Sequence, residues 1–104
     1  MASTKGYLEF ILEQLSELDG ITHRAMMGEY ILYYRGKVFG GIYDDRLLVK
    51  QVPAAVNLIP DAELELPYEG AKEMLMVDDV DNREFLCELV QSMWEELQEK
   101  KKKK

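Results

Sequence analysis

Residues 24–50 decide the fold of this chain and read RAMMGEYILYYRGKVFGGIYDDRLLVK. β-Branched and aromatic runs alternate in this stretch with turn residues at short intervals, which predicts an antiparallel β-meander. Arg35-Gly36 is a two-residue connection of the kind that a tight hairpin uses, and Asp44-Asp45 supplies the next turn. With the run that precedes Gly28, the expected strands are residues 21–26, 29–34, 37–43 and 47–50.

The hairpin turn also predicts a strand register. The pairs that follow from it are Tyr33 with Val38, Leu32 with Phe39 and Tyr30 with Gly41. One face of the hairpin then carries Tyr30, Leu32, Tyr34, Phe39 and Tyr43, and the other carries Ile31, Tyr33, Val38 and Ile42. Because neither face is polar, we expect helices or a partner to cover both of them at least in part.

Two glycines, Gly40 and Gly41, interrupt the second hairpin strand. Glycine weakens the interior of a strand, so its presence there indicates a local requirement. We expect a β-bulge, or the close approach of another backbone or of a large aromatic side chain from a neighbouring strand. A ligand cleft is a further explanation.

Helices are expected at both ends of the chain. Residues 4–18 carry apolar side chains at the spacing of one helix face, after a cap at Ser3 or Thr4 and before Asp19-Gly20. These side chains are Tyr7, Leu8, Ile11, Leu12, Leu15 and Leu18. Asp81 and Glu84 form a capping box that opens the last helix. Its apolar stripe is Phe85, Leu86, Leu89, Val90, Met93, Trp94 and Leu97.

The segment between the meander and the last helix is mixed. Pro53 suits the first position of a helix and Pro60 ends it, which predicts a helical connector over residues 53–58. Residues 61–66 alternate apolar and acidic side chains like an edge strand, but they stay ambiguous before Pro67. Residues 72–77 indicate a fifth strand. The predicted fold class is α+β, with an antiparallel sheet of four to five strands packed by N- and C-terminal helices.

Composition indicates one globular domain over residues 1–99, followed by a disordered lysine tail over residues 100–104. Apolar residues make up 47% of the chain, yet none of the apolar runs approaches the roughly 20 residues of a membrane span. The N-terminus lacks the apolar core of a signal peptide, and the single cysteine, Cys87, excludes an intrachain disulfide. We therefore expect a cytoplasmic protein with no membrane partner.

Charge argues against a dedicated DNA-binding role. The formal net charge is -7, and without the five terminal lysines 8 basic side chains face 20 acidic ones, a balance near -12. A field of that sign repels phosphate backbones. We interpret the lysine tail as a solvated end. Its alternatives are a weak electrostatic tether for nucleic acid or an acidic partner, or an addition to the natural chain.

No catalytic, cofactor or metal motif is evident in the sequence. His23 is the only histidine and cannot anchor a metal site by itself. Cys87 lies beside the apolar stripe of the last helix, where we expect a small buried hydrophobe, with redox sensitivity as the alternative. Asp78, Asp79 and Asp81 lack the spacing of an EF-hand and are interpreted as charges and a cap at a helix start.

The meander resembles the N-terminal domain of the TfoX (Sxy) family of competence regulators, and the resemblance covers most of the chain. The matching positions are Arg24 and Met26 of the Arg-x-Met start, Gly28, the hairpin glycine Gly36, and Lys50 at the end of the meander. The departures are Met27, in place of the usual aromatic residue, and Glu29, in place of the second glycine.

The resemblance implies a regulatory function. Members of this family act on natural competence as coactivators of transcription with a cyclic-AMP-responsive activator, and full-length members add a helical C-terminal domain. We hypothesise a non-enzymatic adaptor domain that binds a protein of the transcription machinery, as a monomer or a homodimer. The candidate partner-binding residues are Arg24, Met26, Met27, Glu29, Tyr33, Tyr34, Lys50 and Tyr68.

Two other functions stay open. A nucleic-acid-binding module would stack bases on the sheet aromatics Tyr30, Tyr34, Phe39 and Tyr43, helped by the lysine tail. Packing beneath a helix is the competing use of the same aromatic side chains. A small enzyme would use carboxylates such as Glu69 and Glu73, in a pocket that perturbs their pKa values.

Overall fold

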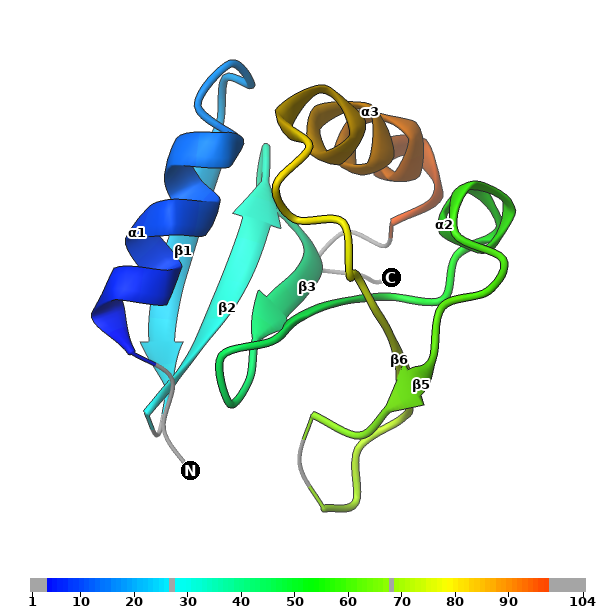
Figure 1. Ribbon diagram of the computed structural model, residues 1–104, viewed down its shortest axis with the longest axis horizontal. Helices are drawn as coiled ribbons and strands as arrows, with labels where there is room; N and C mark the ends of the chain where they lie inside the picture. Colours follow the sequence, from blue (N-terminus) through cyan, green and yellow to red (C-terminus); the bar gives the residue numbers. More distant parts are fainter. Residues whose placement is uncertain (1–3, 27, 68, 98–104) are drawn as a thin grey trace, which may run out of the picture.

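The computed structural model describes residues 4–26, 28–67 and 69–97 (Figure 1). Met27, Tyr68 and the lysine tail lie outside the described residues. The elements are α1 (Lys5–Gln14), β1 (Ile21–Met26), β2 (Glu29–Tyr34), β3 (Lys37–Ile42), β4 (Leu47–Val49), α2 (Pro53–Leu58), β5 (Leu64–Glu65), β6 (Met74–Met76), α3 (Arg83–Met93) and the 3₁₀ turn η1 (Trp94–Glu96). Every strand and helix expected from the sequence is present, so the predicted α+β class is confirmed.

The six strands form a single antiparallel sheet in the order β1-β2-β3-β4-β6-β5. The prediction of four to five strands was one too low, because the ambiguous segment 61–66 contributes β5. This short strand pairs with β6 at the far edge of the sheet. Because β5–β6 pairing joins residues that are 9 and 11 positions apart, well beyond a tight turn, hairpin rules do not predict it.

The register of the central hairpin differs from the prediction beyond its turn. Tyr33 pairs with Val38 as expected, but a bulge between Leu32 and Tyr33 shifts the next pairs by one residue. The observed pairs are Leu32 with Gly40, Ile31 with Gly41 and Tyr30 with Ile42. The predicted pairs of Leu32 with Phe39 and Tyr30 with Gly41 are therefore wrong. A one-residue slip moves side chains to the other face, so Ile42 joins the core and Tyr43 leaves it.

Gly40 lies at this bulge and is in close contact with β4. A Cβ atom there would overlap the carbonyl oxygen of Leu48 and lie 2.9 Å from the Cα atom of Val49. The backbone of β4 thus approaches β3 more closely than any side chain would permit. At Gly41 a Cβ atom would lie 2.7 Å from the ring of Tyr43. The expected bulge and close backbone are both present, whereas the aromatic ring comes from Tyr43, directly after the same strand, and not from a neighbouring strand.

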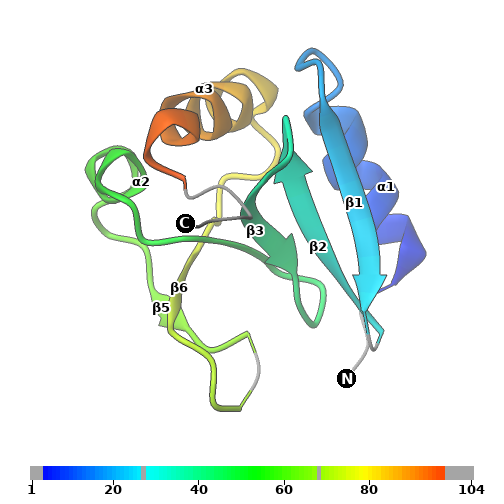
Figure 2. The ribbon, with the colours of Figure 1, turned by 180° about the vertical axis from the view of Figure 1, so that it is seen from behind.

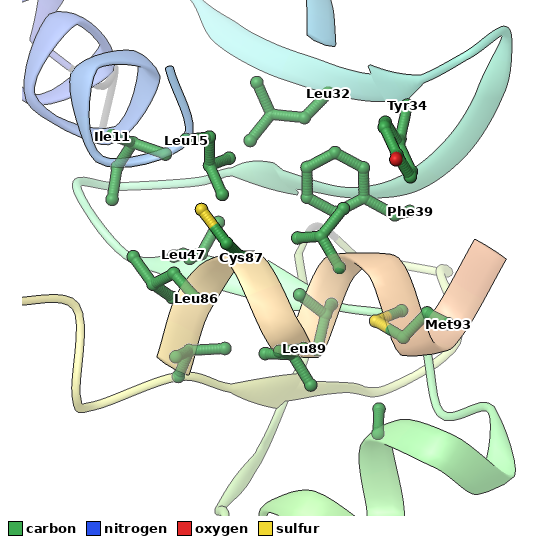
Figure 3. Close-up of a cluster of buried hydrophobic side chains, with 14 of the residues drawn as sticks. Ile11, Leu15, Leu32, Tyr34, Phe39, Leu47, Leu86, Cys87, Leu89 and Met93 are labelled. Atoms are coloured by element: carbon green, nitrogen blue, oxygen red, sulfur yellow. The ribbon is translucent and has the colours of Figure 1, made fainter. Parts of the chain in front are cut away.

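The hydrophobic core lies between the sheet and two helices. Helices α1 and α3 cover the same face of the sheet, as Figure 1 shows, and their apolar stripes meet the side chains of β2, β3 and β4. Figure 3 shows this cluster, in which the labelled residues are Ile11, Leu15, Leu32, Tyr34, Phe39, Leu47, Leu86, Cys87, Leu89 and Met93. At about 25 cal/mol per Å² of buried apolar area, this layer supplies most of the driving force for folding.

The ends of both helices differ from the sequence prediction. Helix α1 starts after Thr4, whose side chain accepts a hydrogen bond from the Tyr7 amide, but it ends at Gln14 instead of residue 18. Helix α3 is capped by Asn82, whose side-chain oxygen accepts a hydrogen bond from the amide of Phe85 at 3.1 Å. The predicted cap at Asp81 is therefore wrong by one residue, since both side chains can cap a helix and only geometry selects one.

The end of α3 is tied to the central hairpin. The indole Nε1 of Trp94 donates a hydrogen bond to the carbonyl oxygen of Tyr34 at 3.1 Å. The ammonium of Lys37 donates to the carbonyl oxygen of Trp94 at 3.3 Å and lies 4.0 Å from the centre of its ring. A cation at a helix C-terminus and over an indole face is favourable on both counts. These contacts hold α3 against β2 and β3.

Candidate functional site

The face of the sheet opposite α1 and α3 carries a cleft with a volume of about 610 Å³. Figure 2 views the molecule from this side, where no helix lies in front of β1, β2 and β3. We call this feature the open-face cleft. It is lined by Met26, Ile31, Val38, Gly40, Tyr43, Lys50, Gln51, Val52, Pro67, Ala71, Lys72, Glu73, Met74, Glu96 and Leu97. Its volume falls within the range of about 300–1,000 Å³ that is usual for ligand sites.

The strands β1, β2 and β3 form one wall of the cleft. Met26, Ile31 and Val38 line it, and Ile31 and Val38 are only partly buried. Met26 is 40% exposed, an unusual value for a methionine in a sheet. The alternation of side chains along β1 places Arg24 on the same face, because Arg24 pairs with Ile31. This wall is therefore apolar and has a basic side chain at its edge.

The bulge shapes the floor of the cleft. It turns Tyr43 away from the core and onto the cleft side, where this side chain is only 6% exposed. Gly40 adds no side chain to the floor, so the close contact of β3 with β4 leaves a hollow above it. A glycine at the bulge thus contributes to the depression.

The opposite wall comes from segments that lie far from the meander in the sequence. Residues 50–52 follow β4, and residues 71–74 lead into β6. A hydrogen bond of 2.9 Å from the side-chain amide of Gln51 to the carbonyl oxygen of Glu73 joins the two segments. This wall includes the half-buried side chains of Val52, Ala71 and Met74. Two separate parts of the chain therefore close one side of the cleft.

The charged side chains around the cleft differ in whether they form hydrogen bonds or ion pairs within the protein. The Glu96 carboxylate accepts a hydrogen bond from the Ala54 amide at 2.8 Å, at the start of α2. Within residues 4–26, 28–67 and 69–97, the ion pairs are Arg46 with Glu65 and Arg83 with Glu13. Lys50, Lys72 and Arg24 belong to neither pair. These three cations and the exposed carboxylate of Glu73 therefore lie around an apolar face.

The structure brings together several of the residues singled out by sequence. Met26 and Lys50 line the cleft, and Arg24, Glu29 and Tyr33 belong to the same face of the sheet by strand register. The Glu29 carboxylate accepts a hydrogen bond from the Asp44 amide at 3.1 Å, so it has a structural partner. Met27 and Tyr68 lie outside the described residues.

Tyr34 is a correction to the predicted surface. Its side chain is 4% exposed and packs in the core between the sheet and α3, so little of it is accessible to a partner. The neighbouring Tyr33 is partly exposed because it lies on the other face of β2. Of two adjacent tyrosines, strand alternation therefore places only Tyr33 on the accessible face.

The predicted base-stacking surface is not formed by these aromatics. Phe39 is fully buried, Tyr34 is almost so, and Tyr30 packs against the same core. Tyr43 lies on the other face of the sheet. The competing expectation, that these rings pack beneath a helix, is confirmed for the first three of them.

Sequence reasoning missed most of the second wall of the cleft. Val52, Ala71, Lys72 and Met74 were not proposed as site residues, whereas Lys50 and Glu73 were named. The one available signal was the charged pair Lys72-Glu73 before an apolar strand segment. The pairing of β4 with β6 is what brings residues 71–74 to the meander, and this pairing spans an intervening helix and strand.

The cysteine and the histidine, which lie away from the cleft, are engaged in packing contacts. Cys87 is 8% exposed in the core, and its thiol donates a weak hydrogen bond to the carbonyl oxygen of Gln14. Burial, and next the charge of Glu17, raises the pKa of the Cys87 thiol, which makes the nucleophilic thiolate rarer. His23 lies on β1 with its ring edge-on to Tyr30. Among the described residues no three His, Cys, Asp or Glu side chains are grouped to hold a metal ion.

Glu69 and Glu73, the carboxylates of the enzyme hypothesis, are both exposed, and Glu73 lies at the cleft. No helix in the described ranges has both the length and the apolar character that crossing a membrane requires.

Comparison with known proteins places the chain in a family. The TfoX N-terminal domain profile matches residues 13–99. A relative from Spirochaeta aurantia, described as an uncharacterized 12.7 kDa protein in the trpE 5' region, is 35% identical over 80 residues. That alignment covers 77% of this chain and 70% of the relative. No solved structure matches the chain. Because the profile spans the meander, the cleft and α3, the chain belongs to the TfoX N-terminal domain family.

Proposed function

We propose that this domain is a non-enzymatic regulatory adaptor that binds another protein through the open-face cleft. The observation that carries the proposal is the unequal covering of the sheet. One face is sealed by α1 and α3, whereas the other offers an apolar hollow of about 610 Å³ with Arg24, Lys50 and Lys72 around it. Protein-binding surfaces typically combine such an apolar centre with a polar rim.

Membership in the TfoX N-terminal domain family supports a regulatory context related to natural competence. In that context the partner is a component of the transcription machinery, and it presents acidic and apolar side chains to the cleft. The acidic chain itself favours this choice over duplex DNA, because a net charge of -7 repels a phosphate backbone.

Site-specific photo-crosslinking tests the proposal in cells that carry the native gene. The photoreactive amino acid p-benzoylphenylalanine replaces Lys72, which is exposed at the cleft, or Glu88, which is exposed on α3. We expect one discrete adduct from position 72 and none of the same mass from position 88. Mass spectrometry of the adduct then names the partner.

Binding of the purified partner sharpens the test. Val38→Asp places a carboxylate on the cleft wall, and Val56→Asp places one on the exposed surface of α2 as a matched control. We expect the first variant to weaken binding at least about tenfold, and the second to leave it unchanged, because only the first buries a charge against a partner. Equal adducts at positions 72 and 88, or equal binding by both variants, would contradict the proposal.

A nucleic-acid-binding role is the second candidate, favoured by the three basic side chains on the open face. Fluorescence anisotropy of duplex and single-stranded DNA at low and physiological salt tests it, with the full chain beside a version ending at Glu99. We expect no binding by either chain at physiological salt. Binding that disappears with residues 100–104 would make the lysines a non-specific tether, and binding that persists would replace the adaptor proposal.

A further inference from the structure

The two edges of the sheet are built differently. The edge strand β5 has two residues and lies between Pro60 and Pro67, so it offers little backbone for pairing. The edge strand β1 has six residues, of which five are exposed, and it contains neither proline nor lysine. Short strands, prolines and lysines are the usual protection of a sheet edge. Only β5 has such protection.

The hydrogen bonds at the start of β1 show which of its backbone groups point outward. The amide of Arg35 donates to the carbonyl oxygen of Gly20 at 2.9 Å, immediately before the paired residues Ile21 and Tyr34. Hydrogen-bonded and non-hydrogen-bonded pairs alternate along an antiparallel ladder. The residues of β1 that bond inward to β2 are therefore Thr22, Arg24 and Met26. Those with outward-pointing N–H and C=O groups are Ile21, His23 and Ala25.

We propose that β1 pairs with β1 of a second copy, antiparallel about a twofold axis at His23. The three outward-pointing residues are spaced evenly about His23, so this register is the one that uses all of them. His23 then faces His23 of the second copy, and Ile21 faces Ala25. Each of these pairs exchanges two backbone hydrogen bonds, which joins the two sheets into one. The proposal goes beyond the proposed function and does not depend on it.

Side chains on both faces agree with this register. On the cleft side Thr22 faces Arg24 of the second copy, which avoids placing two guanidinium groups opposite each other. A register centred on Arg24 would oppose those groups and use fewer outward-pointing residues. The strand carries no carboxylate, although the net charge of the chain is -7.

The symmetry has a consequence for the cleft. A twofold axis between antiparallel strands runs perpendicular to the sheet, so both copies present the same face on the same side. The two open-face clefts therefore face one direction. A dimeric partner or a repeated motif would meet two sites at once, which raises its apparent affinity without any new contact.

Disulfide trapping measures the proposed register directly, in a Cys87→Ala background. In a hydrogen-bonded antiparallel pair the Cα atoms are about 5.5 Å apart, within the range of about 4.4–6.8 Å that a disulfide spans. We expect His23→Cys to form a covalent dimer under mild oxidation. Arg24→Cys is the control, since two residue steps put its copies about 8 Å apart. A mixture of Thr22→Cys and Arg24→Cys chains is expected to form the mixed dimer.

Sedimentation velocity of the wild-type chain, from about 10 µM to 1 mM, supplies the second measurement. We expect a concentration-dependent dimer. Ala25→Pro removes an outward N–H group that β2 does not use, whereas Ala25→Val keeps it. The proline variant should dimerise at least about tenfold more weakly, and the valine variant should dimerise like the wild type. Circular dichroism checks that both variants are folded.

Several results would overturn the proposal. One is a wild-type chain that stays monomeric across the range, and another is a failure of His23→Cys to crosslink. Equal crosslinking at positions 23 and 24 would show random collision instead of a fixed register. Because Ala25 does not line the open-face cleft, loss of dimerisation without loss of the crosslink at position 72 leaves the adaptor proposal standing.

Discussion

Both faces of the sheet carry apolar side chains, but helices cover only one of them. Leu32 and Phe39, on the helix face, are fully buried. Ile31 and Val38, which directly precede them in the same strands, line an open cleft. Hydrophobic side chains alone therefore do not decide which face is sealed. The helices decide it, because the segments at both ends of the chain pack on one side. What remains on the other side is an apolar surface available for binding.

The largest expected effect on stability comes from a substitution of Gly40, where the backbones of β3 and β4 are in close contact. In Gly40→Ala the new Cβ atom overlaps the Leu48 carbonyl oxygen, so β3 and β4 must separate. We expect a loss of about 4 kcal/mol or more in the free energy of unfolding, measured by urea denaturation. Gly6→Ala is the control, since a Cβ atom there meets nothing within 4 Å. Equal stabilities for the two variants would show that the close approach of β4 is not required.

A neighbouring pair of residues compares the two faces directly. Phe39→Ala removes a fully buried ring and is expected to cost about 3–5 kcal/mol. Val38→Ala removes a partly exposed side chain from the cleft wall and is expected to cost less than about 1.5 kcal/mol. Calorimetric or denaturant unfolding of both variants provides the values. A larger cost at Val38 would mean that the open face is also covered.

The cap of α3 is a smaller contribution to the sealed face. Asn82→Ala removes the side-chain oxygen that accepts the Phe85 amide and is expected to cost about 1 kcal/mol. Asp81→Ala, one position earlier, should cost less, since it removes only a charge near the helix start. Thermal unfolding distinguishes the two variants. The opposite order would restore the capping box predicted from the sequence.

The smallest effect concerns Tyr7, which α1 packs against the core. Burial raises the pKa of the Tyr7 hydroxyl, and the charge of Asp45 raises it further. The unfolded chain therefore loses this proton at lower pH than the folded chain. The contribution to stability is complete below about pH 10 and declines as the pH rises through the folded-state pKa. In urea denaturation measured at several pH values above about 10, the free energy of unfolding of Tyr7→Phe should fall less steeply with pH than that of the wild type. The same slope of unfolding free energy against pH in both proteins would contradict the assignment.

The fold was predictable where its signals are local. The turn at Arg35-Gly36, the cap of α1 at Thr4 and the apolar stripes are short-range patterns, and each produced the expected element. The position of the bulge was not predictable, because hairpin rules assume a regular ladder beyond the turn and do not place an extra residue in it. The cap of α3 was misplaced for a different reason. Asp81 and Asn82 have equivalent side-chain chemistry, and backbone geometry chooses between them.

Only the part of the cleft that comes from the meander was predictable from the sequence. Met26 and Lys50 belong to the meander, and the sequence marked both. Ala71 and Lys72 reach the cleft only through the pairing of β4 with β6, and sequence spacing carries no information about that contact. Tyr34 was misjudged because aromatic character was read without its place in the alternation along β2. Strand alternation, applied to Tyr33 and Tyr34, would have separated them.

The hydrogen bond from the Ala54 amide to the Glu96 carboxylate has a consequence for folding during synthesis. Helix α2 has no side-chain cap of its own at its first residue, and its acceptor is made 42 residues later. A chain still emerging from the ribosome therefore exposes α2 and the meander without the segment that anchors them. Because Glu96 completes this contact, we expect the domain to reach its native state only after the segment that contains Glu96 has left the ribosome.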